Sequence, residues 1–160
     1  MEYLWAPWRI KYIEKIISSG DESCIFCDKP AENKDAENFI LYRGELNFVI
    51  MNRFPYNSGH LMVAPYRHVA ALDELNGEEL NEHYKLVARC NSVLKKIMKP
   101  DGFNIGMNIG RVAGAGIDKH IHSHIVSRWN GDTNFMPVIA GTKVVNESLE
   151  DTYCKLKGEF

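Results

Sequence analysis

The sequence predicts an α+β fold: an antiparallel β-sheet of about five strands with one long helix packed on it. Three observations support this. Short apolar runs bounded by turn residues recur along 38–65 and again along 103–127, as expected of strands in a meander. Between them, residues 78–99 carry apolar side chains at steps of three and four, the spacing of an amphipathic helix. At 160 residues, the chain is long enough for one domain with its own core.

Three strands are predicted before the long helix, at 38–43, 47–52 and 60–65. A short turn at Gly44 joins the first two, and a loop with Pro55 and Gly59 leads into the third. Residues 18–38 are polar and rich in turn formers, so they are predicted to form a loop.

The long helix is predicted at 78–99, because its apolar residues form one stripe and Pro100 and Gly102 end the pattern. Two more strands, 103–108 and 120–127, and a short helix at 147–157 complete the prediction. With a helix inserted before the last pair of strands, the helix is expected to cover one side of the sheet.

Composition and charge narrow the function classes. The net charge of −2 gives no electrostatic reason to expect binding to long nucleic acid, although a local pocket for a small phosphorylated ligand remains compatible with it. The sequence contains no run of eighteen apolar residues, so no membrane partner is expected. Glu2, Arg9 and Lys11 interrupt the N-terminal segment, which therefore does not resemble a secretory signal. A cytoplasmic location is the expectation.

The four cysteines divide into one close pair and two single residues. The spacing Cys24-x-x-Cys27 is typical of a zinc knuckle or of a thioredoxin-like redox motif, and a chance pair of small apolar residues is the alternative. The redox motif requires a strand-to-helix βαβ setting, which the predicted elements lack. Cys90 and Cys154 lie on apolar faces of helical patterns and are predicted to be core residues.

Three histidines, His120, His122 and His124, alternate along the last predicted strand. They are expected on one face of it, because successive side chains of a strand point to opposite faces. Packing explains three adjacent imidazoles poorly, since each ring has two nitrogens that need partners. One metal ion cannot bind all three, because the first and the last are about 13 Å apart on a strand. One nucleophile with neighbours in other roles fits better, whereas isolated His83 is interpreted as an ordinary satisfied histidine.

A glycine-rich run precedes the histidines. Gly106, Gly110, Gly114 and Gly116 punctuate GMNIGRVAGAG. Such a run lets backbone N–H groups approach phosphate oxygens, although a plain flexible loop is the alternative. An anion-binding loop beside a histidine array predicts phosphoryl or nucleotidyl transfer.

Three features of the sequence together resemble the histidine triad (HIT) superfamily. They are the alternating histidines and the segments NFVIMNRFPYNSGHLMVAPYRHV and GFNIGMNIGRVAGAGIDKHIHSHIVSRWNGDTNFMPV. LWAPWR near the N-terminus and TNFMPVIAGTKVVNESLEDTY near the C-terminus resemble its bacterial branch that contains diadenosine tetraphosphate phosphorylases. The resemblance implies a single HIT-like domain over 1–160. Its parts are an N-terminal arm with the CxxC loop at 1–37, a core at 38–127 and a C-terminal extension at 128–160.

The resemblance implies that His122 is the nucleophile. It would attack the α-phosphorus of a nucleotide and form a nucleotidyl-histidine intermediate, which agrees with the nucleophilicity of neutral imidazole near pH 7. Its other ring nitrogen is expected to donate to a backbone carbonyl. His124 would contact the phosphate or the leaving-group oxygen and help to protonate it.

By the same resemblance, the nucleoside binds along the second and third predicted strands. Phe48 and Ile50 are expected to flank the base, and Asn52 matches the ribose-binding position. His60 also lies at a family position, but no role follows for it from the sequence.

The phosphate would contact Asn108, together with backbone N–H groups of Gly116 and Ile117. Ile117 departs from several nucleotide-hydrolysing branches, which have a hydroxyl residue there, so phosphate contact at this position is expected from the backbone. Ser123 and Ser127 also depart from the family pattern, in which these positions are usually apolar and proline, respectively.

The resemblance further implies a structural zinc site made of Cys24, Cys27, His68 and His120, the tetrahedral Cys₂His₂ donor set. No organic cofactor is expected. Family members usually form homodimers through a long helix and a sheet edge, so the helix at 78–99 is the candidate for such contacts here.

The leading functional hypothesis is cleavage of a dinucleoside polyphosphate, with diadenosine tetraphosphate as the model substrate. Attack of inorganic phosphate on the intermediate would make the chain a phosphorylase, and attack of water would make it a hydrolase. The alternatives are a nucleoside phosphoramidase and a non-catalytic nucleotide-binding regulator. Intact His122, His124 and glycine loop argue against the last, because a binding protein can lose its nucleophile.

Overall fold

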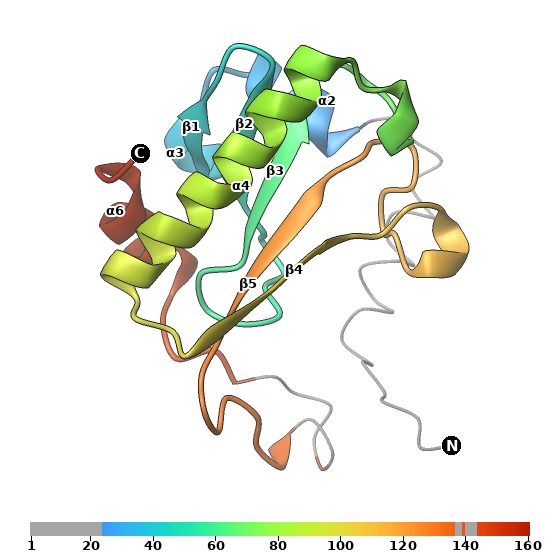
Figure 1. Ribbon diagram of the computed structural model, residues 1–160. Helices are drawn as coiled ribbons and strands as arrows, with labels where there is room; N and C mark the ends of the chain where they lie inside the picture. The colour runs from blue at the N-terminus through green and yellow to red at the C-terminus, as the bar shows by residue number, and fades with distance from the viewer. Residues whose placement is uncertain (1–23, 137–138, 140–143) are drawn as a thin grey trace.

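The computed structural model describes residues 24–136, 139 and 144–160, and a five-stranded antiparallel sheet forms its centre (Figure 1). The predicted α+β fold is confirmed. The strand order is β1-β2-β3-β5-β4, so β4 lies at the edge beyond β5. The strands are β1 (Ile40–Arg43), β2 (Asn47–Met51), β3 (Leu61–Pro65), β4 (Gly102–Met107) and β5 (Ser123–Arg128).

The long helix α4 (Gly77–Ile97) lies across one face of this sheet, in contact with β2, β3 and β5 (Figure 1). Its ends agree with the predicted helix to within two residues. Asn76 caps its N-terminus, because its side chain accepts from the backbone N–H of Glu79 while the Glu79 carboxylate accepts from the backbone N–H of Asn76. Acidic residues in the first turn and lysines in the last complement the helix dipole.

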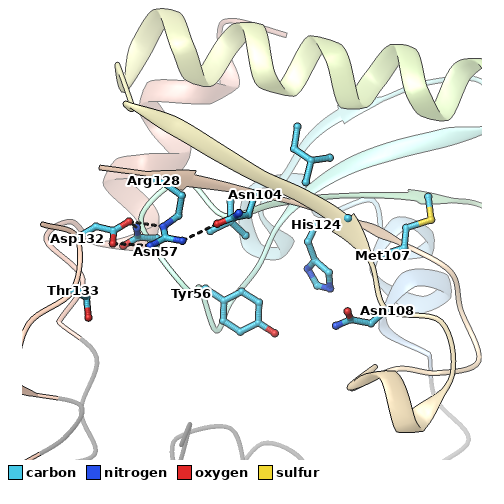
Figure 2. A pocket seen from close by; sticks show the side chains of 12 residues that line it. Tyr56, Asn57, Asn104, Met107, Asn108, His124, Arg128, Asp132 and Thr133 are labelled. Carbon is cyan, nitrogen blue, oxygen red and sulfur yellow. Dashed lines mark hydrogen bonds and ion pairs between the residues drawn. The ribbon is translucent and has the colours of Figure 1, made fainter. Parts of the chain in front are cut away.

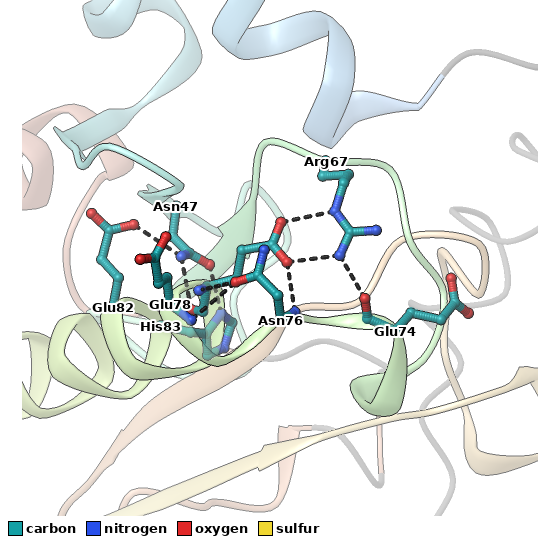
Figure 3. A network of polar contacts seen from close by, with 8 residues as sticks. Asn47, Arg67, Glu74, Asn76, Glu78, Glu82 and His83 are labelled. Carbon is teal, nitrogen blue, oxygen red and sulfur yellow. Dashed lines mark hydrogen bonds and ion pairs between the residues drawn. The ribbon is translucent and has the colours of Figure 1, made fainter.

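Polar contacts also tie the start of α4 to the segment that follows β3 (Figure 3). The Arg67 guanidinium donates to both carboxylate oxygens of Glu79 at 2.8 and 2.7 Å. These bonds hold the pKa of the Glu79 carboxyl at about 2, so it stays ionised near neutral pH. This pairing fixes the helix relative to the loop that carries His68.

The main core lies between the sheet and two helices, α4 and the C-terminal α6 (Leu149–Lys157). Side chains that point to this face, such as Val49, Val63 and Ile125, are completely buried. Leu94 of α4 and Leu156 of α6 are completely buried as well. The two helices therefore cover one side of the sheet. This agrees with the prediction that the long helix covers one side.

A smaller core lies on the opposite face, beneath helix α2 (Ile25–Ala31). Here the prediction of a loop over 18–38 is wrong for its described part, because α2 and the short helix α3 (Asp35–Asn38) lie in that segment. Burial of Phe26 against Phe48, with ring centroids 6.5 Å apart, outweighs the poor helix signal of this sequence. Residues 1–23, including LWAPWR, lie outside the described residues.

Two further differences concern single residues. Cys90 is completely buried as predicted, but Cys154 is exposed, because it lies on the outer face of α6. Strand β5 begins at Ser123, so His120 and His122 lie in the segment that leads into the strand. In the described part of the chain, no helix combines the length and the apolar character that crossing a membrane requires.

Candidate active site

His122 is buried next to β5, on the sheet face away from α4. Its Nδ1 lies 2.8 Å from the backbone oxygen of His120. Because a carbonyl oxygen only accepts, the ring hydrogen is on Nδ1, and Nε2 keeps a lone pair. Burial lowers the pKa of His122, which favours the neutral, nucleophilic imidazole. The contact to a backbone carbonyl is the one expected from the family resemblance.

The neighbouring rings restrict how His122 can turn. Phe26 lies against it with ring centroids 4.5 Å apart, and the His124 ring stands nearly perpendicular to it at 4.8 Å. Ile121, the residue before His122, is buried, and its backbone N–H donates to the oxygen of Val69 at 2.7 Å. The segment before β5 is therefore fixed by backbone and side-chain contacts, which hold the His122 ring in one orientation.

His124 borders a cavity of about 460 Å³ that extends along β4 and β5 (Figure 2). Figure 2 shows the His124 ring pointing into the same space as Asn108 and Tyr56. This size is in the range of small-molecule sites. The lining residues are Tyr56, Asn57, Asn104, Ile105, Gly106, Met107, Asn108, His124, Val126, Arg128, Asp132 and Thr133.

The end of the cavity away from His124 is built around Arg128. Its guanidinium donates to the Asp132 carboxylate at 2.6 and 3.0 Å and to the side-chain oxygen of Asn104 at 2.7 Å (Figure 2). Asn57 also donates to Asp132, at 2.8 Å. Sequence reasoning missed Tyr56, Asn104 and this cluster. Only the Arg–Asp spacing of four residues in SRWNGD hinted at it, and that spacing is common in surface turns.

The glycine-rich run forms a tight loop beside Asn108, and it contains the short helix η2 (Arg111–Ala113). Gly110 and Gly114 on either side of η2 have φ of 81° and 89°, a conformation that side-chain-bearing residues rarely adopt. Asn108 donates to the Gly114 oxygen at 3.5 Å. These glycines are therefore needed for the backbone path of the loop.

The predicted base- and ribose-binding residues lie elsewhere on the same sheet face. Phe48 and Ile50 are buried under Phe26, and Phe48 also stacks on Tyr66 with centroids 5.2 Å apart. Asn52 accepts from the backbone N–H of Phe54 at 2.9 Å. None of the three predicted residues lines the cavity described above, whereas Asn108 and His124 do.

Ile117 and Gly116 complete the predicted phosphate-binding set. Ile117 is half-buried and packs against the small core beneath α2. Gly116 is also half-buried, in the turn between η2 and His120. The loop thus leads from the cavity edge directly to the buried histidine segment.

The four residues predicted to bind zinc lie together, with all their ligand atoms within 4.8 Å of one another. Nδ1 of His120 lies 3.3 Å from the Cys24 sulfur, 3.6 Å from the Cys27 sulfur and 3.3 Å from Nδ1 of His68. Tetrahedral zinc with bonds of about 2.1 Å to nitrogen and about 2.3 Å to sulfur separates its ligand atoms by about 3.4–3.8 Å. The donor set therefore fits this metal.

The hydrogen bond made by the second ring nitrogen of His120 also supports a zinc site. Its Nε2 donates to the Pro65 oxygen at 2.9 Å, which leaves the Nδ1 lone pair directed at the sulfurs and at His68. Burial raises the pKa of the Cys27 thiol to about 11 when no metal compensates it. Metal binding at this pair is therefore expected to release protons.

His83 on α4 is completely buried and both of its ring nitrogens are hydrogen-bonded, as its interpretation as an ordinary core histidine requires; Figure 3 shows it beside Asn47. The Asn47 amide nitrogen donates to the Glu82 carboxylate, so its oxygen accepts from Nδ1 of His83 at 3.0 Å. Nε2 of His83 then accepts from the Ser123 hydroxyl at 2.7 Å. The departure at Ser123 is thus explained, because this hydroxyl satisfies a buried ring on the helix side.

Ser127, which also departs from the family pattern, has no such explanation. Its hydroxyl oxygen is buried and makes no hydrogen bond within the described part of the chain.

The sheet, the helix on one face and the imidazole segment on the other define a histidine triad protein. A family model for the HIT domain matches residues 33–131, more than half of the chain. The chain belongs to the HIT family.

Among its relatives, an AP-4-A phosphorylase of Mycobacterium tuberculosis is 37% identical over 166 residues, which cover all of this chain and 85% of that protein. An asymmetrical bis(5'-nucleosyl)-tetraphosphatase of Schizosaccharomyces pombe is 32% identical over 93 residues, covering 58% of this chain and 50% of that protein.

Solved structures of histidine triad proteins resemble this fold as well. A zinc-bound histidine triad family protein from Mycobacterium smegmatis has a TM-score of 0.69 at 26% identity, covering 86% of this chain and 92% of its own. A hypothetical histidine triad nucleotide-binding protein from Sulfolobus tokodaii has a TM-score of 0.67 at 29% identity, covering 85% of this chain and 88% of its own.

Proposed function

We propose that this protein cleaves a phosphoric anhydride bond of a dinucleoside polyphosphate, through a nucleotidyl intermediate on His122. The observation that carries the proposal is the bond from Nδ1 of His122 to the His120 carbonyl, 2.8 Å long. It puts the reactive lone pair on Nε2 of a buried, neutral ring. A lone pair held in one orientation is what nucleophilic attack at phosphorus requires.

The cavity beside His124 supports a substrate that extends beyond one nucleotide. With the α-phosphorus at His122, the departing polyphosphate would pass His124 and Asn108 and continue toward Arg128. Much of the charge on the Arg128 guanidinium is compensated by Asp132, so the far end is polar rather than strongly cationic. Such an end suits a ribose or a base better than a terminal phosphate.

Relatives support the same substrate class. The mycobacterial relative named AP-4-A phosphorylase aligns with this whole chain, and the yeast relative is named as a dinucleoside tetraphosphatase. We extend both names to this protein as a proposal, with inorganic phosphate as the acceptor that releases the intermediate. A homodimer in the cytoplasm is part of the same proposal.

The proposal includes a structural zinc ion held by Cys24, Cys27, His68 and His120. When bound, the metal would supply a cross-link and no reactive group. The carbonyl of His120 orients His122, so the cross-link would also hold the backbone that positions the nucleophile. Elemental analysis of the purified protein should find about one zinc per chain, and Cys24→Ser should remove it. Absence of stoichiometric metal from the unaltered protein would reject this part.

Incubation with diadenosine tetraphosphate, with and without inorganic phosphate, tests the reaction. A phosphorylase yields ADP and ATP only when phosphate is present, whereas a hydrolase yields AMP and ATP in its absence. Adenosine phosphoramidate should be the poorer substrate. No cleavage of any dinucleoside polyphosphate, with turnover of the phosphoramidate, would reject the proposal.

A further inference from the structure

His60 is a buried histidine beside the active site to which the sequence assigns no role. It lies immediately before β3, and only 1% of its surface is exposed. Its Nδ1 faces the backbone N–H of Tyr56 at 3.1 Å, and its Nε2 faces Nδ1 of His124 at 2.9 Å. The His60 ring therefore connects a backbone amide to the side chain that borders the cavity.

The backbone amide determines where the hydrogen of His60 lies. The N–H of Tyr56 can only donate, so Nδ1 of His60 must accept and carries no hydrogen. The neutral His60 ring then has its hydrogen on Nε2. A doubly protonated His60 would turn an N–H toward the N–H of Tyr56.

The hydrogen on Nε2 of His60 in turn determines which nitrogen of His124 is protonated. Nε2 of His60 donates, so Nδ1 of His124 accepts and carries no hydrogen. The hydrogen of the His124 ring is therefore on Nε2. The ring borders the cavity, and Figure 2 shows it directed toward the space beside Asn108. A cationic His124 would place two hydrogens between the facing nitrogens of the two rings.

We infer that His60 is a positioning residue that holds His124 as a neutral hydrogen-bond donor, so that the site favours substrates whose leaving group departs as an anion. This inference rests on the proposed function, because it concerns the leaving group of the same reaction. It differs from the expectation, drawn from the family resemblance, that His124 helps to protonate the leaving oxygen.

The bond changes balance without an acid. The Nε2 lone pair of His122 forms the nitrogen–phosphorus bond, and the electron pair of the broken phosphorus–oxygen bond goes to the departing oxygen. His124 donates a hydrogen bond to that oxygen and keeps its proton, because neutral imidazole is a very weak acid. His60 could not replace a lost proton, since its Nδ1 is occupied by the Tyr56 amide.

The leaving group must then be stable as an anion. A terminal phosphate has its second pKa at about 6, so a departing polyphosphate needs no added proton near pH 7. An amine with a pKa of about 10 must be protonated as it leaves. The hydrogen-bond pattern at His124 therefore favours phosphoric anhydrides over phosphoramidates.

Nitrogen-15 NMR of histidine-labelled, zinc-loaded protein tests the assignment directly, because the two nitrogens of each neutral ring report which one carries the hydrogen. We expect both His60 and His124 as neutral Nε2–H rings near pH 7. His60→Gln, whose amide nitrogen can still donate, should keep the His124 pattern, and His60→Leu should give a mixture. A hydrogen on Nδ1 of His124, or a cationic His124, would overturn the inference.

Activity with two AMP esters gives a second readout. Without acid catalysis, the phenyl ester should react slower than the p-nitrophenyl ester by on the order of 10²-fold or more, since a general acid would recover about that factor. His60→Leu should lower kcat on both esters by about 10-fold, because part of the population loses the donor. Equal rates with the two esters would contradict the neutral donor.

His83→Gln is the matched control, since it removes another completely buried histidine that does not contact His124. It should leave the ratio between the two esters unchanged. The NMR result stands apart from the proposed function: the expected ring forms without cleavage of dinucleoside polyphosphates would reject that function alone. Cleavage with a cationic His124 would reject only the role of His60.

Discussion

The two faces of the sheet use polar residues in opposite ways. On the helix face, Asn47, His83 and Ser123 bond one another and are buried with the main core. On the other face, His122 bonds the His120 carbonyl and His124 borders the cavity, and both rings belong to the proposed reaction. In this proposal, adjacent residues of one segment serve stability and reaction separately. Substitutions at neighbouring positions should therefore have effects that separate in the same way.

The largest expected effect is a loss of turnover when His122, on the sheet face opposite α4, is replaced. His122→Ala should lower kcat on diadenosine tetraphosphate by on the order of 10⁴-fold or more, because the covalent route is lost. Nucleotide affinity, measured by calorimetry, should change by less than about 10-fold, since the ring is one contact among several. Turnover close to that of the unaltered protein would remove His122 from the mechanism.

A matched change on the helix face should lower stability and leave turnover almost unchanged. Leu94→Ala opens a cavity under the sheet, where Leu94 is completely buried in the main core. The free energy of unfolding should fall by about 2–5 kcal/mol in urea titrations. Below the unfolding transition, kcat should remain within about threefold. A large loss of kcat in a still-folded protein would show that the two faces are not separable.

Because His83 is buried on the helix face, we expect the free energy of unfolding to depend on pH. Burial lowers its pKa from 6.5 to about 4, so the unfolded chain binds this proton at higher pH than the folded chain. Its contribution to stability is complete above about pH 6.5 and is lost as the pH falls toward 4. This difference in the pKa of His83 between the unfolded and the folded chain corresponds to about 3 kcal/mol of stability.

The difference between the unaltered protein and His83→Gln isolates this residue. Plotted against pH, the difference in unfolding free energy should slope between about pH 6.5 and 4 and be flat above that range. Glu79, whose pKa is about 2, loses its contribution at lower pH, between 4.5 and 2. A flat difference over the whole range would show that His83 does not stay neutral in the folded chain.

The smallest effect is expected from Ser123→Ala, one residue from the nucleophile. It leaves Nε2 of His83 without its donor, which should cost about 1–3 kcal/mol of stability. The neighbouring His122 and His124 point to the other face, so kcat should change by less than about threefold. A loss of activity as large as that of His122→Ala would break the comparison between the faces.

Local patterns explain why the sequence predicted so much of the fold. β2 and β3 are short apolar runs, buried on both faces and bounded by turn residues, so they could be recognised as strands from the sequence alone. The apolar stripe of α4, with Pro100 and Gly102 after it, predicted a helix at nearly its observed bounds.

What sequence reasoning missed depends on contacts between distant segments. Helix α2 has little helical signal of its own, and burial of Phe26 on the sheet explains its presence. The cluster around Arg128 draws Asn57 and Asn104 from different loops and strands. The tautomer of His124 depends on the backbone amide of Tyr56, 68 positions earlier, through His60. Local spacing carries no information about such pairs.

Trapping the covalent intermediate shows whether His122 is the nucleophile. The protein is mixed with diadenosine tetraphosphate in the absence of phosphate, quenched before the intermediate turns over, and digested for mass spectrometry under conditions that preserve phosphoramidates. We expect one added AMP moiety per chain, on the peptide that contains His122, and none in His122→Ala. An adduct on another residue, or turnover without any adduct in the unaltered protein, would contradict it.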